Sequence, residues 1–188
     1  IYTAIYTGMR QGELLGLTWK NVDLKHKVLN VRQQLQYQPG NGYVFKEPKT
    51  PRSKRQIPLT PGMVDVFKEI RKLQAQDKLL LGVKKDGNEE DAADQSKYSD
   101  NQTATEIHSP EDDASDKKKK YEDNDLVFCL ENGKPLDGTN LTKRFKALAK
   151  KHGHPEMRFH DLRHTCATLL LAAGVDPKKV QDILGHES

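Results

Sequence analysis

The sequence has only two cysteines, no long hydrophobic run and no acidic metal cluster, and each absence excludes a class of protein. Cys129 and Cys166 are too few for a disulfide framework and stand in no spacing typical of a metal site, so we expect buried thiols in a reducing compartment. The longest apolar stretch, from Cys166 to Val175, is far too short to span a membrane, and no secretory signal opens the chain. The acidic residues that might have formed a nuclease-type metal cluster are too scattered to do so: Asp161, Asp176 and Asp182. We therefore expect a cytoplasmic protein with no cofactor and no membrane partner.

The 188 residues are enough for one ordinary domain. Charged residues are distributed unevenly along them. A mean hydropathy of -0.83 and a charged content of 31% point to a polar segment within that domain. The segment 84–123 holds 7 Lys and 13 Asp or Glu with almost no large aliphatic residue, and we predict that it is a disordered insertion. Of the 31 basic and 27 acidic residues, 24 and 14 then remain in the other 148, a net charge of +10. Such an excess favours a polyanionic partner through counterion release and a nucleoid-associated location.

Hydrophobic periodicity and turn signals predict two short helices followed by a small sheet. Residues 1–6 read as the end of a helix whose beginning is missing, and residues 12–19 suit a short buried helix. Extended runs at 28–31, 43–45 and 55–59 are separated by turn residues, which predicts a three-stranded antiparallel sheet.

The rest of the fold is predicted to be helical. Thr60 and Pro61 are typical of a helix start, and the apolar stripe that follows predicts a helix to about Asp77. Beyond the insertion we expect a short strand at 126–128 and three helices, which begin at Thr139, Phe159 and Asp176, the last of them ending at Gly185. The fold class is therefore α+β and mainly α-helical, in a single domain over 1–188 that we expect to be truncated at both ends.

Two pairs of polar side chains lie near opposite ends of the chain. Arg10 and Glu13 are three residues apart, and His160 and Arg163 have the same spacing, so each pair leaves one face of a helix. Together with His186 these residues suit a phosphodiester, because a guanidinium binds phosphate oxygens bidentately and an imidazole exchanges protons near neutral pH. No metal is needed in such a site.

Other basic residues are weaker candidates for the same chemistry. The loop 48–55 offers a flexible ammonium group that could enter a groove or protonate a leaving oxygen. The basic residues Lys143 and Arg144 stand on a predicted helix and are either a solvated face or contacts to backbone phosphates. His164 follows Arg163 directly, so we expect it to point to a different side and to make a structural hydrogen bond.

Four motifs in a fixed order carry a family resemblance. They are Thr7-Gly8-Met9-Arg10-Gln11-Gly12-Glu13-Leu14, the lysine-containing loop that ends in Gln56-Ile57-Pro58-Leu59, His160-x-x-Arg163, and Leu184-Gly185-His186. In this order, context and spacing they resemble the tyrosine recombinases, the phage integrase family, over nearly the whole chain except the acidic insertion. Among these, the loop and the tail are most similar to integrases of phages and conjugative transposons.

The resemblance implies a tyrosine recombinase catalytic-domain fold and site-specific recombination through a 3′-phosphotyrosine intermediate, without metal or ATP. Arg10 and Arg163 would hold the scissile phosphate and His160 would assist proton transfer from the nucleophile. His186 would hydrogen-bond a nonbridging oxygen, and Lys49 would protonate the departing 5′ hydroxyl. Lys49 is chosen over its basic neighbours by counting back from the end of the loop. The resemblance further implies that Glu13 orients Arg10. From their charge, we expect Arg52, Lys54, Lys143 and Arg144 to be the residues that contact double-stranded DNA.

One departure from the family concerns the nucleophile, which the resemblance places a little beyond the Leu-Gly-His motif. All six tyrosines precede that motif, at positions 2, 6, 37, 43, 98 and 121. We therefore expect the given polypeptide to be a monomer in solution and to bind DNA without cleaving it. The resemblance implies that full recombinases assemble as tetramers on DNA. A DNA-binding relic that lost its nucleophile and a type IB topoisomerase-like relaxing enzyme remain as alternatives.

Overall fold

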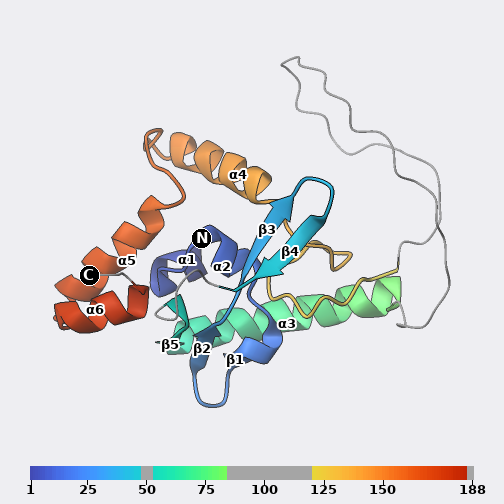
Figure 1. Ribbon diagram of the computed structural model, residues 1–188, viewed down its shortest axis with the longest axis horizontal. Coiled ribbons are helices and arrows are strands. Elements are labelled where there is room, and N and C mark those ends of the chain that lie inside the picture. The colour runs from blue at the N-terminus through green and yellow to red at the C-terminus, as the bar shows by residue number, and fades with distance from the viewer. Residues whose placement is uncertain (48–52, 84–119, 186–188) are drawn as a thin grey trace.

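The computed structural model describes residues 1–47, 53–83 and 120–185. Helices surround two small antiparallel sheets (Figure 1). The helices are α1 (Tyr2–Thr7), α2 (Gln11–Leu15), α3 (Pro61–Leu81), α4 (Gly138–Lys151), α5 (Asp161–Ala172) and α6 (Pro177–Leu184), with a 3-10 turn η1 (Trp19–Asn21). The strands are β1 (Val22–Asp23), β2 (Val28–Val31), β3 (Gln34–Gln38), β4 (Gly42–Lys46) and β5 (Arg55–Pro58).

The strands form two sheets, and the prediction that the three extended runs share one sheet is wrong in that detail. β2 pairs with β1 on one side and with β5 on the other, with Leu29 opposite Ile57. The predicted run 43–45 lies in β4, which instead pairs with β3 in a separate hairpin. In β3, with the sequence Gln-Leu-Gln-Tyr-Gln, only Leu35 is buried. The strand lacks the β-branched residues that are typical of strands. Besides the backbone ladder, the hairpin is stabilised by the buried Leu35 and by the cross-strand contact of the Tyr37 and Tyr43 rings, whose centroids lie 5.4 Å apart.

The main core lies between α3 and the three-stranded sheet. Phe67 of α3 and Leu29 of β2 are fully buried, and Ile57 of β5 is nearly so. Thr60 caps α3 as predicted, since its hydroxyl accepts the Met63 amide, and the helix continues to Leu81 rather than ending near Asp77. Figure 1 shows α3 running from the three-stranded sheet across the molecule, away from α5 and α6. None of the helices in the described residues has the length and apolar character needed to cross a membrane.

Three predicted boundaries after the insertion need correction and one is confirmed. Residues 126–128 make an isolated bridge from Leu126 to Thr18 instead of a strand. Asp137 caps α4 in place of Thr139, because its carboxylate accepts the Asn140 amide at 2.6 Å. α5 begins at Asp161, two residues later than predicted. The last helix is confirmed, with caps at Asp176 and Gly185.

The predicted insertion, 84–123, lies within the described residues only at its C-terminal end. Residues 84–119 lie outside the described residues, but residues 120–123 pack onto the fold. Tyr121 is 2% exposed and its amide donates to the Gly82 carbonyl at 2.8 Å. The Lys78 ammonium pairs with Asp123 at 2.6 Å. The chain is therefore held at both Val83 and Tyr121, which face each other in a parallel bridge.

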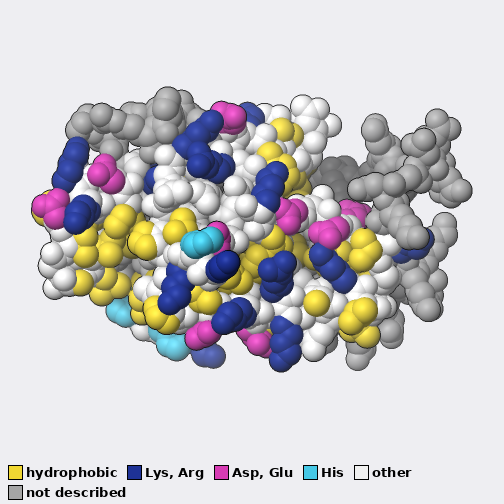
Figure 2. Space-filling view, turned by 90° about the horizontal axis from the view of Figure 1, so that it is seen from below, with side chains coloured by type: hydrophobic (Ala, Val, Ile, Leu, Met, Phe, Trp, Pro, Cys, Tyr) yellow, Lys and Arg dark blue, Asp and Glu magenta, His cyan; other side chains and the backbone are white. Residues whose placement is uncertain are grey.

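Surface charges are mixed on one broad side of the molecule. The face seen from below carries Lys and Arg side chains interspersed with Asp and Glu (Figure 2). Hydrophobic side chains gather on this face toward the end where α5 and α6 lie, and exposed leucines of α5 include Leu169 and Leu171.

Candidate functional site

Four segments far apart in the sequence meet around one group of arginines. They are the turn between α1 and α2, the start of β5, the start of α5 and the end of α6, because α5 packs on both α1 and α6, and α6 packs on β5. Gly8 allows the close approach of α1 to the C-terminal helices. Its φ is 59°, and a Cβ built there would lie 2.3 Å from the Leu184 side chain.

Arg10 and Glu13 form the first pair, as predicted from their spacing. Arg10 is the N-cap of α2, and its amide donates to Glu13 Oε2 at 2.9 Å while its Nη1 donates to Glu13 Oε1 at 3.0 Å. The Glu13 side chain is 3% exposed, whereas that of Arg10 is 39% exposed. The carboxylate is thus buried beneath a guanidinium that still reaches solvent.

Arg55, at the start of β5, is a second partner of Glu13. It was not among the predicted site residues. Its Nη1 and Nη2 donate to the two oxygens of Glu13 at 3.1 and 2.9 Å, and its side chain is almost fully buried. Burial alone would raise the pKa of Glu13, but the hydrogen bonds and charge of Arg55, together with the bonds from Arg10, bring that pKa below its usual value. Glu13 is therefore an ionised carboxylate shared by two arginines.

The sequence did contain a signal for Arg55. In a strand, alternate residues face the same side, and Arg55 is in phase with the buried Ile57 and Leu59. A basic residue on the inward face of a strand needs a buried carboxylate partner. The missing information was the identity of that partner, which lies 42 residues earlier in the chain.

Arg163 lies deepest in the cluster. It is 3% exposed, and its guanidinium donates to the carbonyl oxygens of Gly8, at 2.6 Å, and of Leu184. Burial, followed by the positive charges of Arg10 and Arg55, lowers the pKa of Arg163 to about 10. This group therefore stays charged at neutral pH.

The C-terminal end of α6 receives a bond from each of the three arginines. Arg55 Nε donates to Ile183 O at 2.7 Å, Arg163 donates to Leu184 O, and Arg10 Nη2 reaches Gly185 O at 3.4 Å. The last carbonyls of a helix have no partner within it and carry partial negative charge, so cations stabilise them. The three guanidinium groups thus fix the point at which the chain leaves α6.

His160 joins the cluster at the start of α5, where it is exposed. Partial burial is the largest cause that lowers its pKa, followed by the charges of His164, Arg163 and Arg10. His160 is therefore a neutral imidazole at pH 7. His164 points to a different side from Arg163, as expected, since it is exposed whereas Arg163 is buried. Its ring packs edge-on against that of His160 with centroids 5.4 Å apart. Residues four apart share a helix face, which explains this contact.

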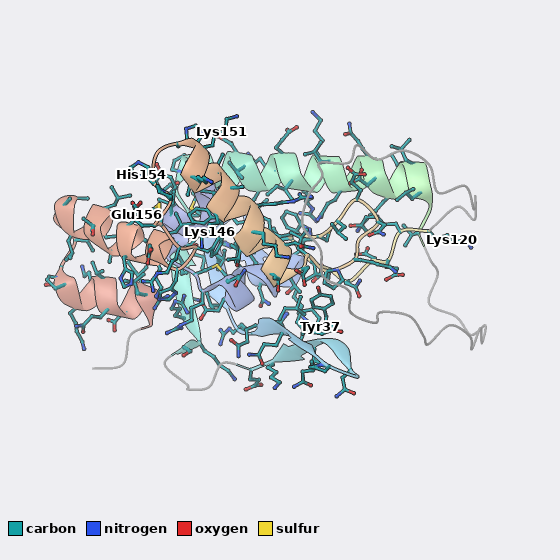
Figure 3. All side chains as sticks on the ribbon, turned by 90° about the horizontal axis from the view of Figure 1, so that it is seen from above. Tyr37, Lys120, Lys146, Lys151, His154 and Glu156 are labelled. Carbon is teal, nitrogen blue, oxygen red and sulfur yellow. The ribbon has the colours of Figure 1, made fainter. Side chains whose placement is uncertain are left out.

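The structure brings together Arg10, Glu13, His160 and Arg163 of the predicted set. Three other predicted residues, Lys49, Arg52 and His186, lie outside the described residues. Lys54 pairs with Glu47 at 2.8 Å beside the loop. Lys143 and Arg144 are exposed on α4, a different element from those that carry the cluster. Figure 3 shows further lysines of the same helix, Lys146 and Lys151, along it.

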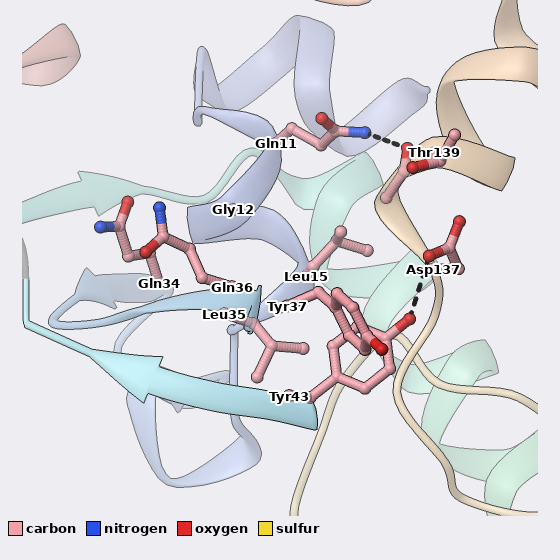
Figure 4. Close-up of a pocket in the computed structure, with 11 residues that line it drawn as sticks. Gln11, Gly12, Leu15, Gln34, Leu35, Gln36, Tyr37, Tyr43, Asp137 and Thr139 are labelled. Carbon is pink, nitrogen blue, oxygen red and sulfur yellow. Dashed lines mark hydrogen bonds between the residues drawn. The ribbon is translucent and has the colours of Figure 1, made fainter. Parts of the chain in front are cut away.

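A separate cavity of about 330 Å³ lies between α2, the β3–β4 hairpin and the start of α4 (Figure 4). The Gln11 amide closes one side by donating to Gly138 O at 2.6 Å, and the Tyr43 hydroxyl donates to Asp137 at 3.1 Å. Burial and then the hydrogen bond to Asp137 raise the pKa of Tyr43. The polar groups that line this cavity are mainly amides and hydroxyls. The positively charged side chains that suit an anion lie instead in the arginine cluster.

Comparisons with known proteins agree with one another. The model of the phage integrase family matches residues 1–188. A tyrosine recombinase XerC-like protein of Caldanaerobacter subterraneus subsp. tengcongensis is 32% identical over 98% of this chain and 41% of its own length. The transposase from transposon Tn916 of Enterococcus faecalis is 27% identical over 99% of this chain and 38% of its own length. The chain thus spans about two fifths of the length of these relatives.

Solved structures show the same similarity. The integrase of transposon Tn1549 in complex with transposon right end DNA has a TM-score of 0.68 at 26% identity, over 100% of this chain and 50% of that one. The XerA recombinase has a TM-score of 0.60 at 24% identity, which speaks for the fold alone.

Proposed function

The chain belongs to the phage integrase family of tyrosine recombinases, and on this premise we propose that residues 1–188 form the catalytic domain of a site-specific DNA recombinase. The predicted fold class, an α+β and mainly helical tyrosine recombinase catalytic domain, is confirmed by the similarity to the Tn1549 integrase. The proposed reaction is integration or excision by strand cleavage and religation, of the kind used by phages and conjugative transposons. Double-stranded DNA is the proposed substrate.

The arginine cluster is the observation that carries this proposal. Arg10, Arg55 and Arg163 bring three positive charges around the single carboxylate of Glu13, and a neutral His160 lies beside them. Such an excess of positive charge in a partly buried site suits a group with delocalised negative charge, and a phosphodiester has that property. Arg163 uses two of its five N–H donors on carbonyls, so it keeps donors for a phosphate oxygen.

The steps of the reaction assign a task to each residue. A tyrosine hydroxyl attacks the scissile phosphorus and passes its proton toward the neutral His160, while the P–O5′ bond breaks. Lys49 gives a proton to the departing 5′ oxygen, and Arg10, Arg163 and His186 stabilise the charge of the pentacoordinate phosphorus. Religation is the reverse step with the 5′ hydroxyl of another strand. Losing one such electrostatic contact is expected to lower the rate by about two to three orders of magnitude.

The nucleophile is proposed to lie in the residues that follow Ser188 in the parent protein. The decisive test extends the open reading frame by roughly twenty codons and incubates the product with a nicked duplex. A protein–DNA adduct that survives denaturation, and that a tyrosine-to-phenylalanine change abolishes, is expected. Binding without an adduct would identify a relic, and relaxation of supercoiled DNA without exchange between two sites would identify a topoisomerase. For assembly we propose a monomer of the given chain in solution and a tetramer of the full-length protein on DNA.

Binding to DNA should depend steeply on salt, because phosphate contacts release counterions. Six phosphate contacts are proposed, so the slope of log K against log[salt] is expected to be about -5.4. They are made by Arg10, Arg52, Lys54, Lys143, Arg144 and Arg163. Fluorescence anisotropy with a labelled duplex at several NaCl concentrations measures this slope. A flat response would contradict a phosphate-binding surface.

A further inference from the structure

We propose that Arg55 is a positioning residue that neutralises Glu13, so that Arg10 keeps its full charge for the scissile phosphate. The inference rests on the proposed function and adds a residue to which the family resemblance assigned no role. It starts from the observation that Glu13 is shared between two arginines that differ in exposure.

Both Arg10 and Arg55 donate hydrogen bonds to the carboxylate of Glu13. Each oxygen of Glu13 accepts one bond from the guanidinium of Arg55 and one from Arg10, through its side chain on Oε1 and its amide on Oε2. Arg55 is bidentate and almost fully buried, whereas Arg10 offers a single guanidinium bond and keeps an exposed side chain. The buried ion pair is therefore Glu13 with Arg55.

The charge balance of the site follows from these hydrogen bonds. If Arg10 were the only partner of Glu13, the two would form a neutral pair and an incoming phosphate would meet a carboxylate directly behind the guanidinium. With Arg55 present, Glu13 and Arg55 cancel each other, and Arg10 carries an uncompensated positive charge. Glu13 can then hold the orientation of Arg10 without weakening its attraction for an anion.

Arg55 also joins three segments that the proposed reaction requires together. Its guanidinium donates to the Ser53 carbonyl at 3.2 Å, at the end of the lysine-containing loop, and to the Ile183 carbonyl at the end of α6. Arg10 is reached through Glu13. One buried side chain thus sets the relative positions of the loop, the α1–α2 turn and the C-terminal helix.

The test is a double-mutant cycle on duplex binding by the full chain. Arg55→Gln leaves Arg10 paired with an uncompensated Glu13, so affinity for a labelled 20-base-pair duplex should fall roughly tenfold and the salt slope should become shallower by about 0.9. Adding Glu13→Gln in that background removes the unbalanced carboxylate and should restore most of the affinity. Arg71→Gln, the same change at an exposed position of α3, is the matched control for the loss of one positive charge.

The sign of the Glu13→Gln effect separates charge compensation from a purely structural role. Compensation predicts that this change strengthens duplex binding in the Arg55→Gln background. A structural role predicts a further loss, because a second partner leaves the buried network. If Arg55→Gln does not fold by circular dichroism, Arg55→Lys decides the matter, because it keeps a positive charge beside Glu13 without the bidentate geometry. An unchanged salt slope of duplex binding supports the proposal, and a slope shallower by about 0.9 overturns it.

The proposed function and this inference fail in different ways. If the unmodified chain does not bind duplex DNA in a salt-dependent manner, the proposed function is wrong. If it does bind, but Arg55→Gln has the same affinity and salt slope as Arg71→Gln, the role of Arg55 is wrong and the proposed function stands.

Discussion

At the scale of single residues, the site holds the buried guanidinium of Arg163 on backbone carbonyl oxygens and without a carboxylate bonded to it in the described residues. Arg163 is buried, and nearby Arg10 and Arg55 add to the repulsion, yet its pKa falls only to about 10. Burying a charge is tolerated when hydrogen bonds replace water, and the carbonyls of Gly8 and Leu184 provide them. The same bonds tie α5 to α1 and α6, so one side chain serves both the stability and the electrostatics of the site.

Replacing Arg163 should therefore reduce stability as well as phosphate binding. In Arg163→Met two buried carbonyls lose their donor, and the free energy of unfolding should fall by about 3 kcal/mol. Urea denaturation followed by circular dichroism measures this loss. Arg158→Met is the control, since Arg158 pairs with Asp161 at the surface and its removal should leave the urea midpoint unchanged. Equal midpoints for the two variants would contradict a structural role for Arg163.

His160 should make DNA binding depend on pH. Its pKa lies below the usual value, so the imidazole is neutral in the free protein at pH 7. A bound phosphate favours the protonated form, which means that DNA binding takes up a proton and affinity rises as pH falls from 7.5 toward 5.5. Because one group takes up at most one proton, it can change the DNA-binding constant by no more than about tenfold per pH unit.

The comparison of His160→Asn with His26→Asn checks this prediction. His26 pairs with Asp23 next to the β1–β2 hairpin, on elements that do not carry the arginine cluster. Anisotropy titrations across the pH range should be flatter for His160→Asn than for the unmodified chain, whereas His26→Asn should follow the unmodified chain. Identical pH profiles for both variants would exclude His160 as the group that takes up the proton.

At the scale of elements, the site depends on how closely α1 approaches the C-terminal helices. Gly8 ends α1 in a left-handed conformation, and it lies against Leu184 of α6 and Cys166 of α5. An added methyl group would collide with both neighbours and would also strain the backbone. Gly8→Ala should therefore cost about 2–4 kcal/mol, with Arg163 displaced from its carbonyl partners.

Gly40→Ala offers a matched comparison for the backbone part of that cost. Gly40 has a φ of 83° in the β3–β4 turn, and a Cβ there would meet nothing within 4 Å. Its change to Ala should cost only about 1–2 kcal/mol. Thermal denaturation of both variants gives the difference, and equal losses would show that the contact with Leu184 is unimportant.

Local signals in the sequence were sufficient for some elements and not for others. Thr60, Asp176 and Gly185 were predicted correctly as helix caps, because capping depends on a few neighbouring residues. The strand β3 was missed although its residues alternate between glutamine and an apolar side chain, because it has no β-branched residue and buries only Leu35. The same holds for the site. The pairing of Arg10 with Glu13 could be predicted from their three-residue spacing, whereas the pairing of Arg55 with Glu13 depends on the tertiary fold.

At the scale of the whole molecule, two oppositely charged parts share one chain. The segment 84–123 is acidic, and the remaining residues carry a net charge of +10. At the two ends of this acidic segment, Val83 forms a bridge with Tyr121, and Lys78 of α3 forms an ion pair with Asp123. The Lys78 ammonium also lies over the Tyr121 ring, 5.3 Å from its centroid. Among the described residues, Val83, Tyr121 and Asp123 therefore connect this part of the chain to the rest of the fold.

Two deletions with different end points test this arrangement. Replacing 84–119 by a short Gly-Ser linker keeps Val83, Tyr121 and Asp123 in place, and a shorter loop should raise the free energy of unfolding by roughly 1 kcal/mol. Replacing 84–123 instead removes the buried Tyr121 and the partner of Lys78, so it should cost about 3 kcal/mol relative to the first deletion. Urea denaturation of both proteins measures the difference. If the shorter deletion were as harmful as the longer one, residues 84–119 would contribute to the fold, and the anchoring by Tyr121 would not be what stabilises this end of α3.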